Sequence, residues 1–182
     1  EILGGLPLSV SSVSEVCDLT EVTEDGDTFT ANAVKKADVY ARRSGETVIA
    51  DDSGLEVAAL DNAPGVHSAR YAGPACDYRK NNEQLIHRLH EKGLTRSPAA
   101  FRCVIALRFP DGRAPVFFEG TCRGEVIDTP RGEYGFGYDP LFVPEGRDKT
   151  FAEMAAEEKN RLSHRYHALL KFKEYVENEI IQ

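Results

Sequence analysis

Two long β-rich segments separated by a turn constrain the fold of this chain more than any other feature. In the first, apolar residues alternate with arginines: Phe101, Arg102, Cys103, Ile105, Leu107 and Arg108. A turn of sequence Pro110-Asp111-Gly112-Arg113 follows, and the second segment runs over positions 116–127. A period of two turns successive side chains to opposite faces of a sheet, and a Pro/Asp/Gly turn between two such segments is typical of a hairpin. The sequence therefore predicts a long antiparallel hairpin.

Helical periodicity is present in three other segments. The first begins at Phe29 and ends before Gly45, the second runs over about 77–92, and the third begins near Ser163. A short β-branched strand over 47–50 follows the first helix. The order helix, strand, helix, hairpin, helix predicts an α/β fold with a mixed sheet flanked by helices. A chain of 182 residues can bury one substantial core, so we expect a single domain over 1–182.

Charge and cysteine usage exclude several classes of function. The formal net charge of −8 opposes binding to nucleic acid or to an anionic membrane. The four cysteines are widely spaced and form no Cys-x-x-Cys pair, so we expect reduced, structural thiols. We find no apolar segment of membrane-spanning length and no signal peptide, and we expect a cytoplasmic protein.

The sequence Asp51-Asp52-Ser53-Gly54 follows the predicted strand over 47–50. Carboxylates at the C-terminal end of a buried strand lie where α/β proteins bind ligands. Adjacent strand residues face opposite ways, so we expect one aspartate to face a cleft while the other braces the turn or binds a metal through water. A carboxylate in such a cleft suits Mg²⁺. The alternative is a solvated turn in which Asp and Ser bond the backbone.

A glycine- and aromatic-rich loop spans positions 132–140. Its three glycines let the backbone approach a ligand, and Phe136 and Tyr138 could present their rings to a flat base. Asp139 could accept a hydrogen bond from a base or a sugar. The alternative is a tight turn whose aromatic rings fill the core.

The sequence Ser163-His164-Arg165 opens the last predicted helix, where cations are locally unfavourable. A bound anion or carbonyl oxygen would remove this conflict. The alternative is a surface ion pair with Glu157 or Glu158. Lys159, taken alone, reads as a solvated helix charge.

Five ordered blocks together resemble the inosine triphosphatase-like family of nucleotide pyrophosphatases. They are Thr28-Phe29 with Asn32-Ala33, Ala50-Asp51-Asp52-Ser53-Gly54-Leu55, Ala63-Pro64-Gly65-Val66 with Ser68-Ala69-Arg70-Tyr71, Gly135-Phe136-Gly137-Tyr138-Asp139-Pro140, and Glu158-Lys159 with Ser163-His164-Arg165. The similarity extends from about Asp25 to the final helix. Five blocks in this order are far more specific than any one of them.

The resemblance implies an elongated, twisted mixed sheet in two lobes around a central substrate cleft, a homodimer, and Mg²⁺-dependent hydrolysis of ITP, dITP and XTP to the monophosphate and pyrophosphate. By the same resemblance, Asp52 is the general base or a metal ligand, with Asp51 as a further metal candidate, and the basic pair His164 and Arg165 donates to the purine 6-oxygen. The implied substrate-binding residues are Ser53, Phe136, Gly137, Tyr138, Asp139, Lys159, His164 and Arg165.

Two departures from the family pattern leave alternatives open. Relatives usually open with a strand ending in a Ser/Thr-Gly-Asn…Lys motif that grips the phosphates, and this chain starts downstream of such a motif. Many also carry a glutamate as a second metal ligand where this chain has Ala31. The alternatives are a non-catalytic nucleotide-binding module and a metal-dependent phosphohydrolase for another modified nucleotide.

Overall fold

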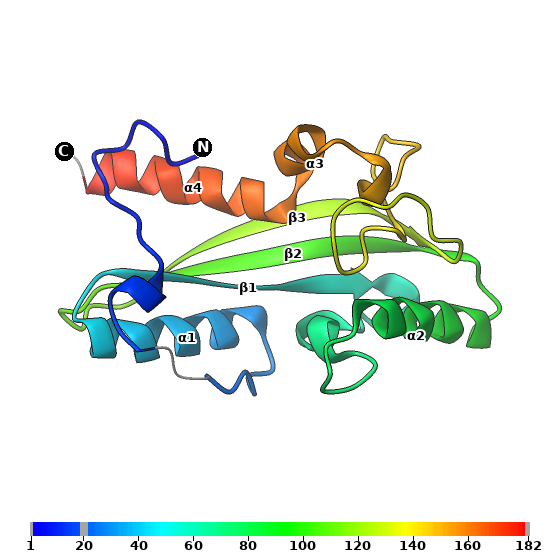
Figure 1. Cartoon of the computed structure of the whole chain (residues 1–182), viewed down its shortest axis with the longest axis horizontal. Coiled ribbons are helices and arrows are strands. Elements are labelled where there is room, and N and C mark those ends of the chain that lie inside the picture. Colours follow the sequence, from blue (N-terminus) through cyan, green and yellow to red (C-terminus); the bar gives the residue numbers. More distant parts are fainter. Residues whose placement is uncertain (1, 19–21, 181–182) are drawn as a thin grey trace.

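A four-stranded antiparallel sheet lies between two layers of helices (Figure 1). The computed structural model describes residues 2–18 and 22–180. The strands occur in the sheet in the order of the chain: β1 (Val48–Val57), β2 (Arg96–Arg108), β3 (Val116–Ile127) and β4 (Phe142–Pro144). The predicted hairpin is confirmed as β2 and β3, in which Leu107 pairs with Val116 and Arg96 pairs with Ile127. Among the described residues every strand pairing is antiparallel, so the parallel pairing of a mixed sheet is not seen there.

The helices cover both faces of the sheet. One face carries α1 (Phe29–Ser44) and α2 (Tyr78–Glu91), and the other carries α3 (Ala156–Leu162) and α4 (His164–Glu179) (Figure 1). Short 3₁₀ helices connect these elements: η1 (Val13–Glu15), η2 (Ala58–Leu60), η3 (Gly65–Arg70) and η4 (Phe151–Glu153). Among the described residues, no helix is long and apolar enough to cross a membrane.

Capping residues explain where the three predicted helices begin. The Thr28 hydroxyl accepts a hydrogen bond from the Ala31 amide at the start of α1, and Gly45 ends that helix with φ 71°. Asp77 caps α2 through two backbone amides, and Ser163 caps α4. The sequence therefore predicted α1, α2 and α4 correctly.

The core is divided between the two ends of the sheet. At one end β2 is buried on both faces, because Val104 and Ala106 pack with α1 while Ile105 and Leu107 pack in the cluster that includes α4. At the other end a single larger cluster surrounds Phe101 and is completed by α2, β4 and η4. These clusters form two lobes on one continuous sheet.

The predicted position of Asp51-Asp52-Ser53-Gly54 at the C-terminal end of a short strand was wrong, and so was the alternative of a turn, because these residues lie in the middle of β1. Asp51 pairs with Ile105 and Gly54 pairs with Arg102. The strand continues because Leu55 and Val57 are completely buried beyond the polar residues and because β2 is long enough to pair with all of them. The expected alternation holds, and the two aspartates face opposite sides of the sheet.

Candidate functional site

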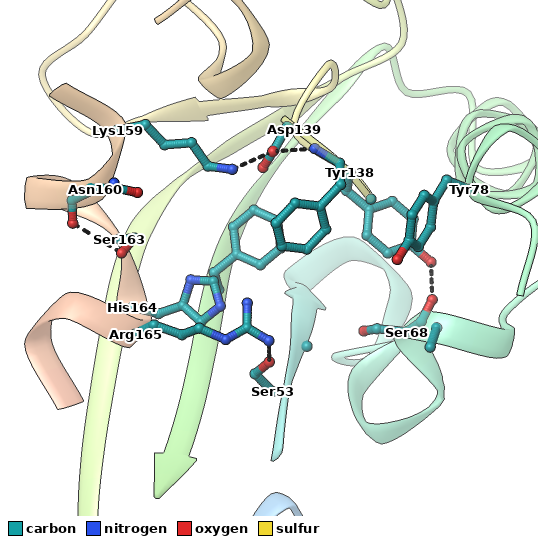
Figure 2. A pocket seen from close by; sticks show the side chains of 15 residues that line it. Ser53, Ser68, Tyr78, Tyr138, Asp139, Lys159, Asn160, Ser163, His164 and Arg165 are labelled. Carbon is teal, nitrogen blue, oxygen red and sulfur yellow. Dashed lines mark hydrogen bonds and ion pairs between the residues drawn. The ribbon is translucent and has the colours of Figure 1, made fainter. Parts of the chain in front are cut away.

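A cavity of about 290 Å³ lies where the two lobes meet (Figure 2). The middle of β1 contributes Ser53 to its lining, and the loop after β3 contributes Phe136, Gly137, Tyr138 and Asp139. Helix α3 contributes Lys159, and helix α4 contributes His164 and Arg165. Residues far apart in the sequence, and predicted separately, are thus brought together around one space.

The two aromatic residues of the loop have different surroundings. The Phe136 side chain is 55% exposed, whereas Tyr138 is 4% exposed and donates its hydroxyl hydrogen to the Ser68 carbonyl at 2.8 Å. Burial raises the pKa of Tyr138. Phe136 is therefore the ring available to a ligand. Tyr138 lines the cavity but is held in the core, as the alternative interpretation of this loop proposed.

Asp139 braces the loop from inside. Its Oδ2 atom accepts a hydrogen bond from the Phe136 amide at 2.8 Å and pairs with the Lys159 ammonium. Gly135 has φ 79°, and a Cβ at that position would overlap the Asp139 carboxylate. Lys159 is consequently a partly buried, fixed cation rather than a solvated helix charge.

Two cations lie beside the exposed ring of Phe136. The Lys159 ammonium is 4.8 Å from the ring centroid, and the Arg165 guanidinium is 5.9 Å from it. Arg165 also donates to the Ser53 hydroxyl at 2.8 Å and contacts the Asp51 carboxylate at 3.0 Å. Asp51, rather than Glu157 or Glu158, is therefore the acidic partner of Arg165.

His164 enters the site as a neutral imidazole. Its ring stacks on Phe101 with 4.9 Å between centroids, and the residue is 8% exposed. Burial, reinforced by the charges of Arg165 and Lys159, lowers the pKa of His164 to about 3. Its Nδ1 atom is buried and has no hydrogen-bond partner among the residues that the structure describes. The expected basic pair therefore consists of one cation and one uncharged hydrogen-bonding group.

Asp52 lies on the opposite face of β1, against α1. It is 7% exposed and accepts hydrogen bonds from Asn32 Nδ2 and Lys36 Nζ, both at 3.2 Å. Lys36 also contacts Glu24 Oε1 at 2.9 Å. Burial raises the pKa of Asp52, and Lys36 and Asn32 only partly offset it. Burial alone would lower the pKa of Lys36, but its contacts with Glu24 and Asp52 outweigh that effect and raise it.

The two faces of β1 offer different chemistry. The cavity presents an aromatic ring and nitrogen donors, which suit a flat base with acceptor groups. The other face presents a buried carboxylate beside an ammonium, which suits a phosphate group and its cation. A ligand that reaches both faces must pass β1 near Ser53, whose hydroxyl accepts a hydrogen bond from Arg165.

The comparison with protein families decides the affiliation of the chain. The family model described as the Ham1 family matches residues 1–175. The chain belongs to the Ham1 family. Ham1 membership agrees with the resemblance seen in the five sequence blocks.

Relatives of this Ham1 chain cover nearly its whole length. The protein named "dITP/XTP pyrophosphatase" of Halalkalibacterium halodurans is 44% identical over 176 residues, covering 97% of this chain and 90% of the relative. The protein of the same name in Geobacter sulfurreducens is 46% identical, covering 96% and 87%. The structure of a HAM1 protein from Coxiella burnetii has a TM-score of 0.89 at 37% identity, covering 97% of this chain and 89% of that one. The expected α/β fold is confirmed.

Several residues of this Ham1 site were not predicted. Lys36 and Glu24 complete the surroundings of Asp52, while Tyr78 and Asn160 line the cavity. Lys36 had a signal, because it lies one helical turn after the fully buried Asn32 on the same face of α1. Glu24 had none, since its role depends on how the loop before α1 folds back.

Proposed function

We propose that this chain hydrolyses the deaminated purine nucleotides ITP, dITP and XTP to the monophosphate and pyrophosphate, which keeps them out of DNA and RNA. The observation that carries the proposal is the pairing of an aromatic, donor-rich cavity on one face of β1 with the Asp52–Lys36 pair on the other. The names of the two curated relatives support it, because both are called dITP/XTP pyrophosphatases.

Base selection follows from the donors beside Phe136. Lys159 and Arg165 carry only donor groups, so they favour the 6-carbonyl of hypoxanthine and xanthine. Adenine presents a 6-amino donor instead, which would leave desolvated donors facing a donor. Neutral His164 can add one N–H donor without a further positive charge.

The proposed reaction is attack of water on the α-phosphorus. The new bond joins the water oxygen to phosphorus, the bond to the bridging oxygen of the β-phosphate breaks, and pyrophosphate leaves. Asp52 accepts the proton of the attacking water, and its raised pKa makes it a better base than an exposed aspartate. Lys36 is placed to bind phosphate oxygens once a substrate draws it from the carboxylates.

The surroundings of Asp52 fit a magnesium ion. Within residues 2–18 and 22–180 no three His, Cys, Asp or Glu side chains cluster as a metal site, but Mg²⁺ takes only one or two protein carboxylates and fills its shell with water and phosphate. The ammonium of Lys36 already occupies a cation position beside Asp52. When bound, Mg²⁺ would neutralise charge on the departing pyrophosphate. Asp51, the other predicted ligand, contacts Arg165 on the opposite face.

We further propose that the protein acts as a cytoplasmic homodimer on free nucleotides. The net charge of −8 supports free nucleotides over nucleic acid, because a polyanion would be repelled. The resemblance stated from the sequence supports the homodimer. The location follows from the sequence expectation, since no apolar segment reaches membrane-spanning length.

Pyrophosphate release from ITP, XTP, ATP and GTP tests the proposal, with Mg²⁺ and with a chelator. We expect magnesium-dependent release from ITP and XTP and little from ATP or GTP. The donors beside Phe136 account for ATP only, because guanine also has a 6-oxygen, so rejection of GTP must depend on the 2-position. Orthophosphate in place of pyrophosphate would indicate the other phosphohydrolase. Nucleotide binding without any release would indicate the non-catalytic module.

The substitution Asp52→Asn tests the proposed role of Asp52 as the general base. We expect turnover to fall by about 10²–10⁴-fold, the usual contribution of a general base, while affinity for ITP changes much less. Asp51→Asn is the matched comparison, because it removes the neighbouring carboxylate from the other face of the strand. If Asp51→Asn abolishes turnover and Asp52→Asn does not, the assignment is wrong.

A further inference from the structure

A second exposed aromatic ring lies at the cavity, outside the loop that carries Phe136. Tyr78 lines the cavity and is 50% exposed. The centroids of the Tyr78 and Phe136 rings are 6.2 Å apart, and the ring planes are inclined by 43°. Figure 2 shows Tyr78 on the side of the cavity away from Lys159 and Arg165. The exposed aromatic surface of the site therefore has two rings and extends away from the two cations.

Helix α2 fixes Tyr78 relative to the loop. Tyr78 is the first residue of this helix, directly after the Asp77 cap. One turn later, Asn82 donates from Nδ2 to the Gly137 carbonyl at 3.0 Å. Residues four apart lie on the same face of a helix, so Tyr78 and Asn82 both face the loop. Because Gly137 follows Phe136 directly, this bond holds the two rings beside each other without a ligand.

The two other tyrosines of this region differ from Tyr78. Tyr138 lines the cavity but is 4% exposed, with its hydroxyl bonded to the Ser68 carbonyl. Tyr134 is 71% exposed, and among the described residues it is not part of the cavity lining. Tyr78 thus combines an exposed ring with a position at the cavity, and Tyr134 provides a matched control.

The donors beside Phe136 do not by themselves select a purine. Uracil presents a 4-carbonyl next to an N–H group, which is the same pair of groups as the 6-carbonyl and N1–H of hypoxanthine. Lys159 and Arg165 carry only donors, so they can bind the carbonyl of either base. The two bases differ in size, because a purine has a second, fused ring. Selection of purines therefore needs a contact that only the longer base reaches.

We infer that Tyr78 is a substrate-binding residue that makes the site selective for purine over pyrimidine nucleotides. A base that stacks on Phe136 with its carbonyl toward the cations extends along the aromatic surface toward Tyr78. The fused rings of a purine reach the Tyr78 ring, whereas the single ring of uracil ends over Phe136. Contact with a second ring adds dispersion attraction and apolar burial for the purine alone. The inference rests on the proposed function for the orientation of the base.

Binding of non-hydrolysable analogues of ITP and UTP, measured by calorimetry, tests the inference without turnover. The weaker ligand is measured by displacement of the tighter one. We expect Tyr78→Ala to weaken binding of the ITP analogue by at least about fivefold, the lower end of what a base–aromatic contact contributes, and to change binding of the UTP analogue by less than about twofold. Tyr78→Phe keeps the ring and should retain both affinities. The control Tyr134→Ala removes a ring outside the cavity and should also retain both.

The ratio of the two affinities separates a contact with the base from a residue that only holds the loop. If Tyr78 only positions Phe136, Tyr78→Ala weakens both analogues equally, because both bases stack on Phe136, and the inference is overturned. Unchanged binding of the ITP analogue by Tyr78→Ala would also overturn it, as would equal binding of the two analogues by the wild type.

A second variant guards against a local effect of alanine at the start of α2. Tyr78→Gln has a flexible side chain without a ring and should lose the same affinity for the ITP analogue as Tyr78→Ala. Thermal unfolding of each variant verifies that it is folded. Binding of the ITP analogue that depends on Tyr78, without pyrophosphate release from ITP, would refute the proposed function and leave this inference standing.

Discussion

Adjacent residues of β1 have different partners because a strand turns neighbouring side chains to opposite faces. Asp52 is buried against α1 with Lys36, whereas Asp51 contacts Arg165 beside the cavity. The same alternation places Ser53 with Asp51, where Arg165 bonds both. A single strand thus supplies the phosphate side and the base side of the proposed site.

His164 makes stability depend on pH. Its pKa is about 3 in the folded chain against an ordinary value of 6.5, so between these values the unfolded chain binds a proton that the folded chain does not. The stabilisation is complete above pH 6.5 and is lost as the pH falls toward 3, at about 1.4 kcal/mol per pH unit. From pH 7 to pH 5 we expect the wild type to lose about 2 kcal/mol more than His164→Gln in urea unfolding. Parallel losses in the two proteins would contradict a buried, neutral histidine.

At the scale of elements, the sequence predicted what local signals specify. The capping residues Thr28, Asp77 and Ser163 allowed the starts of three helices to be predicted, because a cap depends on residues nearby in the chain. It did not predict α3 or the three-residue β4, because such short elements depend on tertiary contacts. The length of β1 was missed for the same reason, since its polar middle is held by pairing with β2.

The site, like the secondary structure, was predicted in part. The residues that line the cavity belong to the ordered sequence blocks, which can be recognised from the sequence alone. The roles of Phe136 and Tyr138 could not be separated, because only the bond from Tyr138 to Ser68 makes one of the two rings a core residue. Lys36 lies one helical turn after Asn32, but only the fold shows that both side chains contact Asp52.

The first turn of α1 can be stabilised by one substitution. It contains no acidic residue, and the exposed Ala31 occupies the third helical position after the Thr28 cap. Ala31→Glu would complete a capping box and favour the helix dipole, so we expect a gain of about 0.3–1 kcal/mol in the free energy of unfolding. Ala31→Lys should lower it in the same denaturant titration. If the two variants are equally stable, the cap does not limit this helix.

The packing of α4 on β3 depends on Gly120. A Cβ at this position would overlap the His164 carbonyl oxygen and the Ala168 amide, which are backbone atoms that cannot rotate away. We expect Gly120→Ala to lower the free energy of unfolding by roughly 1–3 kcal/mol. Because His164 begins α4, the substitution should also raise KM for ITP. The control Glu119→Ala, at an exposed neighbour, should change stability by less than about 1 kcal/mol even though it removes an ion pair with Arg102.

In the whole molecule, the sheet connects two lobes that have separate core clusters. Strand β2 contributes buried residues to the clusters at both ends. Strand β1 contributes buried residues at the α2 end and partly buried ones at the other, and the cavity lies between the clusters. Because both lobes share these strands, unfolding of one lobe would expose the core of the other to solvent. We therefore expect the chain to unfold as one cooperative domain, as the sequence predicted.

Core truncations in each lobe test this cooperativity. Leu89 is completely buried in the cluster at the α2 end, and Phe172 is buried against β3 at the α4 end. Each change to alanine should lower the free energy of unfolding by about 2–5 kcal/mol. If the sheet couples the lobes, either variant shifts one transition that is the same by far-ultraviolet circular dichroism and by tyrosine fluorescence, the probe available in a chain with seven tyrosines and no tryptophan. A biphasic transition in Leu89→Ala, with the α4 lobe melting at the wild-type midpoint, would mean that the lobes fold independently and that nucleotide binding, rather than the sheet, aligns the two halves of the cavity.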